Sequence, residues 1–156
     1  MTTAPTTRAK DTQRRFARLM AQNARRWRRA VDEELKPHGL TEATWLPLLH
    51  LGRAGAPMLQ KELAHSLTLD SSSVVRLLDA LEASGHVTRS TTEDRRAKAV
   101  CLTPLGRRTV VQVEAATDAT RRRYLVGVSL EELETAVRVL EKVAAALAAT
   151  QDPGTE

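Results

Sequence analysis

Several residue types are scarce in this sequence, and each shortage excludes a class of protein. A single cysteine excludes an intrachain disulfide framework and a multi-cysteine metal site. The four histidines form no H-x-x-x-H pattern and no C-x-x-C pair accompanies them, so no metal ion is expected. No apolar run approaches the ~20 residues that span a bilayer, and the N-terminus lacks a hydrophobic signal region. We therefore expect the protein to remain in the cytoplasm.

Catalytic motifs are missing as well. The sequence contains no glycine-rich phosphate loop, no G-x-S-x-G motif and no paired metal-ligand motif. Neither an enzyme nor a cofactor-binding protein is therefore predicted. Aromatic residues make up only 3% of the chain, so its core must be packed mainly with aliphatic side chains.

The composition favours a small folded protein with a polyanionic partner. The 156 residues, 42% of them hydrophobic, suffice for one domain or for one compact module with a dimerising extension. The net charge of +5 favours nucleic acid or an anionic membrane surface as the partner.

Residues 59–103 carry the most informative pattern in the chain. Apolar residues at helical spacing predict one helix over 59–67 and a second that begins after Asp70, whose side chain is placed to cap it. Gly85 follows the second helix, where a left-handed residue is favoured. The alternation in 98–102 then predicts a strand that returns from 87–90 around a basic tip. The stretch predicts a winged helix-turn-helix; the alternative is a generic three-helix core with a solvated hairpin.

The second of these helices has the features of a DNA recognition helix. Its first turn is the hydroxyl-rich Ser71, Ser72 and Ser73, and Arg76 follows one turn later. Small side chains allow close approach to DNA, a helix N-terminus attracts phosphate, and arginine can pair with guanine through two hydrogen bonds. These residues are therefore predicted to enter the major groove.

Long amphipathic helices are predicted on both sides of this unit, giving a mainly α-helical fold with a small β-wing (α+β). A Thr103-Pro104 start precedes the penultimate helix, and Ser129 with Glu132 forms a capping box before the last. Their apolar stripes exceed what the central unit can cover, so we expect a two-fold dimer with recognition helices ~34 Å apart on a palindromic operator. The predicted domains are flexible tails at 1–9 and 151–156, dimerisation helices at 10–53 and 103–150, and a DNA-binding lobe at 54–102.

Three stretches of the sequence resemble the MarR family of transcriptional regulators, and within it the SlyA-like branch. They are RRWRRAVDEELKPHGLTEATWLPLLHL, SSSVVRLLDALEASGHVTR and the wing segment DRRAKAVCLT. The resemblance spans residues 12–148 and is most specific in the wing. It implies that Arg95 enters the minor groove, that Lys98 also contacts DNA, and that Arg96 pairs with a carboxylate such as Asp94 to hold the wing in shape.

The resemblance also implies a binding site for small aromatic carboxylates such as salicylate. The matching positions are Arg25, Arg28, Trp45 and Arg76, where the indole can stack on a ring and the arginines can hold a carboxylate. Several relatives have histidine four residues after the tryptophan, whereas this chain has Leu49. Trp45 can equally be a core residue. If Arg76 serves both DNA and ligand, capture of the ligand would remove a base contact.

Three functions follow as hypotheses. The first is a dimeric regulator that blocks a promoter and is released by an aromatic acid. The second is a regulator without a ligand that competes with other DNA-bound proteins. The third, a helical dimerising adaptor, leaves the basic wing unexplained. Cys101 lies on the returning wing strand and is predicted to be a packing residue, so peroxide is not expected to release the protein from DNA.

Overall fold

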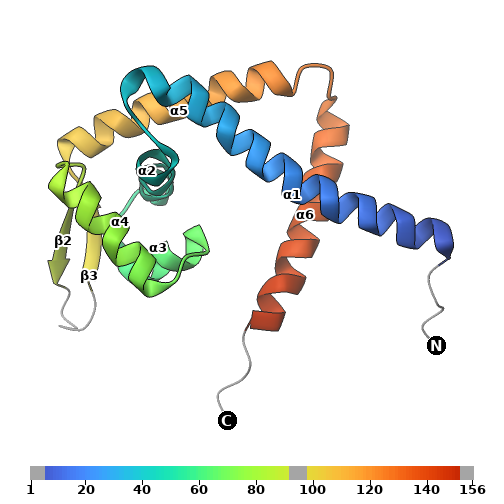
Figure 1. The fold of residues 1–156 in the computed structure, drawn as a ribbon, viewed down its shortest axis with the longest axis horizontal. Helices are drawn as coiled ribbons and strands as arrows, with labels where there is room; N and C mark the ends of the chain where they lie inside the picture. Colours follow the sequence, from blue (N-terminus) through green and yellow to red (C-terminus); the bar gives the residue numbers. More distant parts are fainter. Residues whose placement is uncertain (1–5, 92–97, 152–156) are drawn as a thin grey trace, which may run out of the picture. The chain divides into compact units, whose positions relative to one another are not determined.

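The computed structural model describes residues 6–91 and 98–151 of the chain. The elements follow in the order α1 (Thr7–Leu35), η1 (Lys36–His38), α2 (Glu42–Ala54), β1 (Met58–Leu59), α3 (Gln60–Leu67), α4 (Ser71–Ala83), β2 (Val87–Thr91), β3 (Lys98–Leu102), α5 (Pro104–Tyr124) and α6 (Leu130–Gln151) (Figure 1). They divide into two compact units, Met1–Thr120 and Arg121–Glu156. The predicted mainly α-helical fold with a small wing is confirmed.

The wing is part of a three-stranded antiparallel sheet in the order β1-β3-β2. Strand β3 is central, with Val100 opposite both Met58 of β1 and Arg89 of β2. The sequence did not predict β1, because two residues after Pro57 are too few for an alternating pattern. Residues 92–97, which include the predicted tip residues Asp94, Arg95 and Arg96, lie outside the described residues.

One hydrophobic cluster joins all the elements of the predicted DNA-binding lobe. Val100 of the central strand is fully buried, and Leu63 of α3 and Leu78 of α4 are buried beside it. Helix α2 contributes Leu48 and Leu51, and α5 contributes Val110. The lobe is therefore packed against both flanking helices.

A second hydrophobic cluster joins α1, α2 and α5. It contains Val31, Leu35, Leu40, Trp45, Leu49 and Val113. Trp45 is only 2% exposed, and its indole Nε1 donates a hydrogen bond of 3.2 Å to Oδ1 of Asp32 on α1. A buried indole N–H needs such an acceptor, so this pair fixes α2 against α1.

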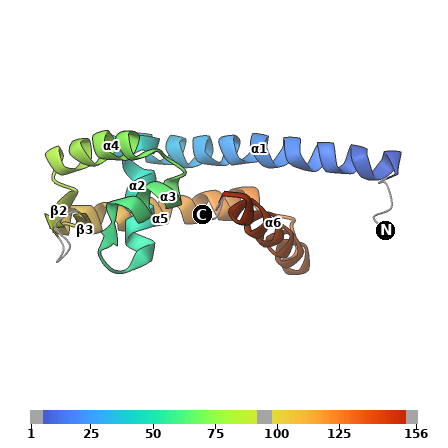
Figure 2. The same cartoon turned by 90° about the horizontal axis from the view of Figure 1, so that it is seen from below.

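The predicted helix ends agree with the structure in most places. Asp70 caps α4, Gly85 has a left-handed φ of +76°, and the Ser129–Glu132 capping box closes the start of α6. Helix α1 begins earlier than expected, at Thr7, because the hydroxyl of Thr6 accepts from the Ala9 amide. It then runs unbroken to its end (Figure 2).

Two glycines allow α5 to approach the lobe closely. A Cβ on Gly106 would lie 2.1 Å from the carbonyl oxygen of His86, which immediately precedes β2. A Cβ on Gly52 of α2 would lie 2.5 Å from Cγ1 of Val110. Both distances are far below van der Waals contact. Gly106 faces backbone, so only glycine fits there, whereas a side chain at Gly52 would require Val110 to move.

The second unit exposes much of the apolar surface of α6. Its large exposed apolar side chains are Leu130, Val137, Val139, Leu140 and Leu147. No described side chain of α6 is buried. A helix with such a stripe needs a partner surface in water.

Candidate nucleic-acid interface

The first turn of α4 is organised by the carboxylate of Asp70. Oδ1 of Asp70 accepts from the Ser73 amide at 2.8 Å and from the Ser72 hydroxyl at 2.5 Å. Oδ2 accepts from the Ser73 hydroxyl at 2.7 Å. These bonds together hold the start of the predicted recognition helix in one conformation.

This arrangement divides the predicted serine contacts into two kinds. The hydroxyl protons of Ser72 and Ser73 are directed at Asp70, so toward DNA these hydroxyls can only accept hydrogen bonds. Ser71 is exposed, and its side chain forms no hydrogen bond with the described residues, so its hydroxyl can donate to a phosphate. The spacing of the serines alone does not reveal this difference.

Arg76 and Val75 lie on the exposed surface of α4. The Arg76 side chain forms no ion pair with the described residues, and its guanidinium is therefore available to an external anion. Val75 is 37% exposed beside it, although it belongs to an apolar residue type. An exposed apolar group on a groove-facing helix can contact a thymine methyl, and the sequence pattern did not single out this position.

The Asp70 cap predicts a response to acid. Hydrogen bonds from the hydroxyls of Ser72 and Ser73, and then from the Ser73 amide, lower the pKa of Asp70 far below its usual value. The pKa of Asp70 is lower in the folded protein than in the unfolded chain, where it is about 4. The stabilisation from the cap is therefore complete above a pH of about 4 and is lost progressively as the pH falls from there toward the folded-state pKa. Hydrogen exchange at the Ser73 amide should therefore accelerate when the pH falls below about 4, beyond the intrinsic pH effect on exchange.

Two substitutions test this prediction. Asp70→Ala should accelerate Ser73 exchange already at neutral pH, whereas Ser71→Ala, which removes a hydroxyl without a described partner, should leave it unchanged. Equal exchange rates in wild-type protein and Asp70→Ala would show that the cap does not order the helix start.

Arg89 fastens the wing to α4, the predicted recognition helix. Its Nη2 lies 2.6 Å from both Oδ1 of Asp79 and Oε2 of Glu82 on α4, and its Nε donates to the same Glu82 oxygen at 3.1 Å. The Arg89 side chain is 16% exposed, and this contact lowers the pKa of Glu82 through hydrogen bonds from the guanidinium. Asp79 and Glu82 lie three residues apart on one helix face. Because the partners are on different elements, the sequence alone did not identify the clamp.

We expect loss of this clamp to weaken DNA binding without unfolding the lobe. Arg89→Leu should lower the thermal midpoint by a few degrees and the affinity for operator DNA by roughly tenfold, because the wing is no longer preorganised beside α4. Thr88→Ala, at an exposed position of the same strand, serves as the control. Equal operator affinities in a binding titration would contradict a positioning role for Arg89.

The base of the wing is closed by Thr103. Its hydroxyl donates to the carbonyl oxygens of Gly85 and His86, at 2.6 and 3.1 Å, and accepts from the Gly106 amide at 3.0 Å. Lys98, a predicted DNA contact, is exposed at the start of β3 and pairs in register with Thr91. The predicted contact of Arg95 and the predicted pair of Asp94 with Arg96 lie outside the described residues.

The four predicted ligand-binding residues lie in different surroundings. Trp45 is buried in the second cluster, and Arg28 forms an ion pair of 3.0 Å with Glu42. Arg25 is exposed on α1, and Arg76 is exposed on α4. A cavity of about 290 Å³ elsewhere in the first unit is lined by none of these four residues.

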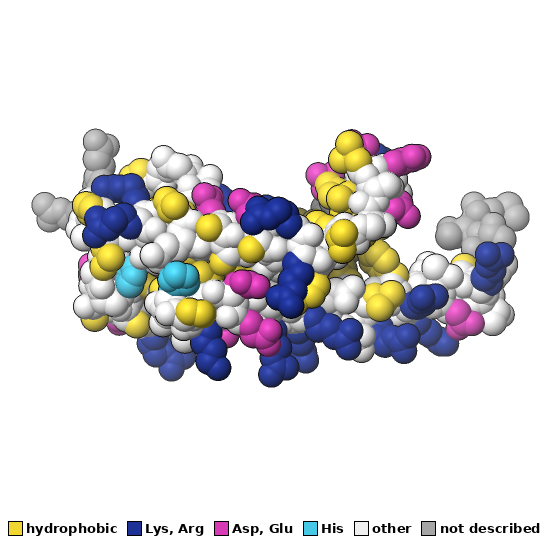
Figure 3. All heavy atoms as spheres, turned by 90° about the horizontal axis from the view of Figure 1, so that it is seen from above, with side chains coloured by type: hydrophobic (Ala, Val, Ile, Leu, Met, Phe, Trp, Pro, Cys, Tyr) yellow, Lys and Arg dark blue, Asp and Glu magenta, His cyan; other side chains and the backbone are white. Residues whose placement is uncertain are grey.

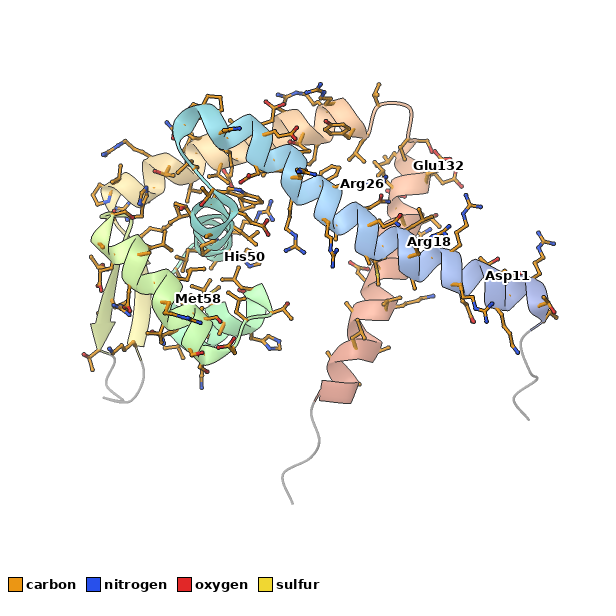
Figure 4. The ribbon with its side chains drawn as sticks, viewed as in Figure 1. Asp11, Arg18, Arg26, His50, Met58 and Glu132 are labelled. Carbon is orange, nitrogen blue, oxygen red and sulfur yellow. The ribbon has the colours of Figure 1, made fainter. Side chains whose placement is uncertain are left out.

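Basic side chains also gather along α1. Figure 3 shows Lys and Arg side chains in a row along the edge that this helix forms. Arg18 and Arg26 project from α1 in Figure 4, and both are exposed. Arg14 is paired with Asp11 at 3.6 Å, also on the surface. Such solvated charges raise the local potential for a polyanion.

No helix among the described residues combines the length and apolar character needed to cross a bilayer. Across residues 6–91 and 98–151, no three or more metal-binding side chains are grouped as a metal site would require.

Comparisons with known proteins give one consistent result. A model of the MarR family matches residues 38–97. The crystal structure of the transcriptional regulator PA3341 is 38% identical with a TM-score of 0.80, over 86% of this chain and 98% of that chain. A MarR-family transcriptional regulator from Rhodococcus sp. RHA1 is 28% identical with a TM-score of 0.74, over 85% and 94%. CouR from Rhodococcus jostii RHA1, bound to p-coumaroyl-CoA, is 27% identical with a TM-score of 0.69, over 88% and 93%.

Proposed function

Because the chain belongs to the MarR family of transcriptional regulators, we propose that it is a homodimeric regulator that binds a palindromic DNA operator in the cytoplasm. The observation that carries this proposal is the exposed, capped N-terminal turn of α4. It presents Ser71 and an Arg76 without an ion-pair partner among the described residues, on the same helix to which Arg89 clamps the wing. Arg95 and Lys98 would add minor-groove and backbone contacts from the wing. The assignment to the SlyA-like branch remains a prediction.

Dimerisation through the terminal helices is part of this proposal. The exposed stripe of α6 and the exposed Phe16, Leu19 and Met20 of α1 support it, because a second copy would remove these side chains from water. A two-fold axis then repeats each recognition helix, and the two half-sites of the operator must mirror that symmetry. Arg96, paired with Asp94, would keep each wing in shape.

We further propose that a small aromatic carboxylate modulates DNA binding. CouR, whose structure contains p-coumaroyl-CoA, is a relative with an aromatic acyl ligand. A ligand of this kind acts only if it binds one state of the protein better than the other. The predicted residues for it are Arg25, Arg28, Trp45 and Arg76.

A regulator without a ligand, acting by competition with other DNA-bound proteins, is the second candidate. The burial of Trp45 and the Arg28–Glu42 ion pair favour it, because both predicted ligand-binding side chains already have partners within the chain. Operator affinity that is unchanged across a panel of aromatic acids would support this candidate.

Selection of bound DNA from a random pool tests the proposed function. We expect an enriched palindrome, with binding that weakens steeply as salt rises because several phosphates must release counterions. Protein that enriches no sequence at low salt, or that remains monomeric in solution scattering, would contradict the proposal.

A further inference from the structure

The 290 Å³ cavity of the first unit lies where α2, β3 and α5 meet. Its wall is mainly apolar and includes Leu51 of α2, Pro57 of the following turn, Val100 of β3 and Val110 of α5. Cavities that hold drug-sized ligands measure ~300–1,000 Å³, so this one suits a small ligand of about one ring.

The two glycine contacts of α5 explain why the cavity walls are fixed. Gly106 lies against the His86 carbonyl, and Gly52 lies against Val110. These contacts hold α5 to the lobe at two points, and Arg107, which lies between Gly106 and Val110 in the sequence, lines the cavity. The walls thus belong to packed elements, and the space does not depend on a surface loop alone.

Arg107 gives the cavity a preference for anions. It is the one charged side chain among the lining residues, all of which are described. Arg107 is exposed, and its Nη1 donates to the carbonyl oxygen of Leu102 at 2.8 Å, which holds the guanidinium beside the lining. Its other N–H groups have no acceptor among the described residues and can bind a ligand. An apolar wall with a single held guanidinium suits a ligand with an apolar body and one carboxylate.

We propose that this cavity binds a small carboxylic acid with an apolar body, and that Arg107 pairs with its carboxylate. The inference rests on the proposed function, because the occupant would be an effector of the regulator, bound at a site separate from Arg25, Arg28, Trp45 and Arg76. The ligand would contact Val100 and Cys101 on β3, the strand that pairs with both β1 and β2. A ligand that prefers one arrangement of this strand would change the position of the wing and hence the affinity for DNA.

Titration of the full chain without DNA tests the proposal, with benzoate as the acid and benzamide as its uncharged analogue. In NMR spectra of the labelled protein, benzoate should cause saturable shifts at the amides of Val100, Cys101 and Val110. Arg107→Gln should weaken benzoate binding by roughly two- to fivefold, the effect of losing an ion pair with an exposed guanidinium. Benzamide binding should not change.

The neighbouring Arg108→Gln is the matched control, because Arg108 is exposed like Arg107 but does not line the cavity. Ala56→Leu, which narrows the cavity, should weaken benzoate and benzamide alike and gives a second test if Arg107→Gln does not fold. Shifts confined to the Trp45 indole and Arg76, or equal benzoate affinity in wild-type protein and Arg107→Gln, would overturn the proposal. Operator binding without benzoate is measured in parallel; its failure would contradict the proposed function, whereas the titration alone decides the cavity.

Discussion

Replacing Arg76 with alanine is expected to reduce operator affinity by roughly one to four powers of ten. A direct arginine contact to a base is worth about 1–3 kcal/mol, and a dimer loses it twice. The folded state should be unaffected, because Arg76 is exposed and unpaired with the described residues. A mobility-shift titration on the selected operator measures the affinity, and a thermal melt checks the fold.

The pattern of the loss identifies what Arg76 contacts. A base contact should relax selectivity at one operator position in each half-site, whereas a phosphate contact should lower the salt dependence of binding with all sequences weakened alike. Arg18→Ala, which removes an exposed arginine from α1, is the control for loss of charge alone. If both variants bind equally well, α4 does not present Arg76 to DNA.

Replacing Gly106 with alanine is expected to lower stability by about 2–4 kcal/mol, although alanine normally favours a helix by ~1 kcal/mol over glycine. The new Cβ would lie 2.1 Å from the His86 carbonyl oxygen, which belongs to the backbone and cannot rotate aside. The same oxygen accepts from the amide and hydroxyl of Thr103 at 3.0 and 3.1 Å. Helix α5 must therefore move and break the closure of the wing. The thermal midpoint should fall by roughly 5–15 °C.

Gly52 supplies the comparison for this prediction. The Cβ added by Gly52→Ala would lie 2.5 Å from Cγ1 of Val110, so this substitution should also destabilise the protein. Here the obstacle is a side chain, and adding Val110→Ala should recover part of the loss. No side-chain change should rescue Gly106→Ala. A Gly106→Ala protein as stable as wild type, at one protein concentration, would show that α5 does not pack as closely as described.

Sequence reasoning predicted the features that depend on neighbouring residues. Asp70 caps α4 and Gly85 takes a left-handed conformation because the side chain and the backbone geometry act within a few residues. The Arg89 clamp and the close approach at Gly106 were not predicted, because each depends on contacts between different elements. A glycine inside a helix pattern carries no signal of what approaches it.

Trp45 shows why the candidate ligand site was harder to predict than the fold. An indole in an apolar helix pattern is compatible with a core or with a pocket wall, and only the packing of α1 distinguishes them. In the structure Trp45 is buried, and its indole N–H donates a hydrogen bond to Asp32. The cavity at Arg107 forms where α2, β3 and α5 pack together. No local sequence pattern predicts that these three elements come together there.

A two-fold symmetric protein should present the start of α4 and its wing to DNA twice. A hydroxyl-radical footprint of the full chain on the selected operator tests this directly. We expect two protected segments related by a dyad, with centres about 34 Å apart along the duplex. A single protected segment, or protection without a dyad, would contradict it.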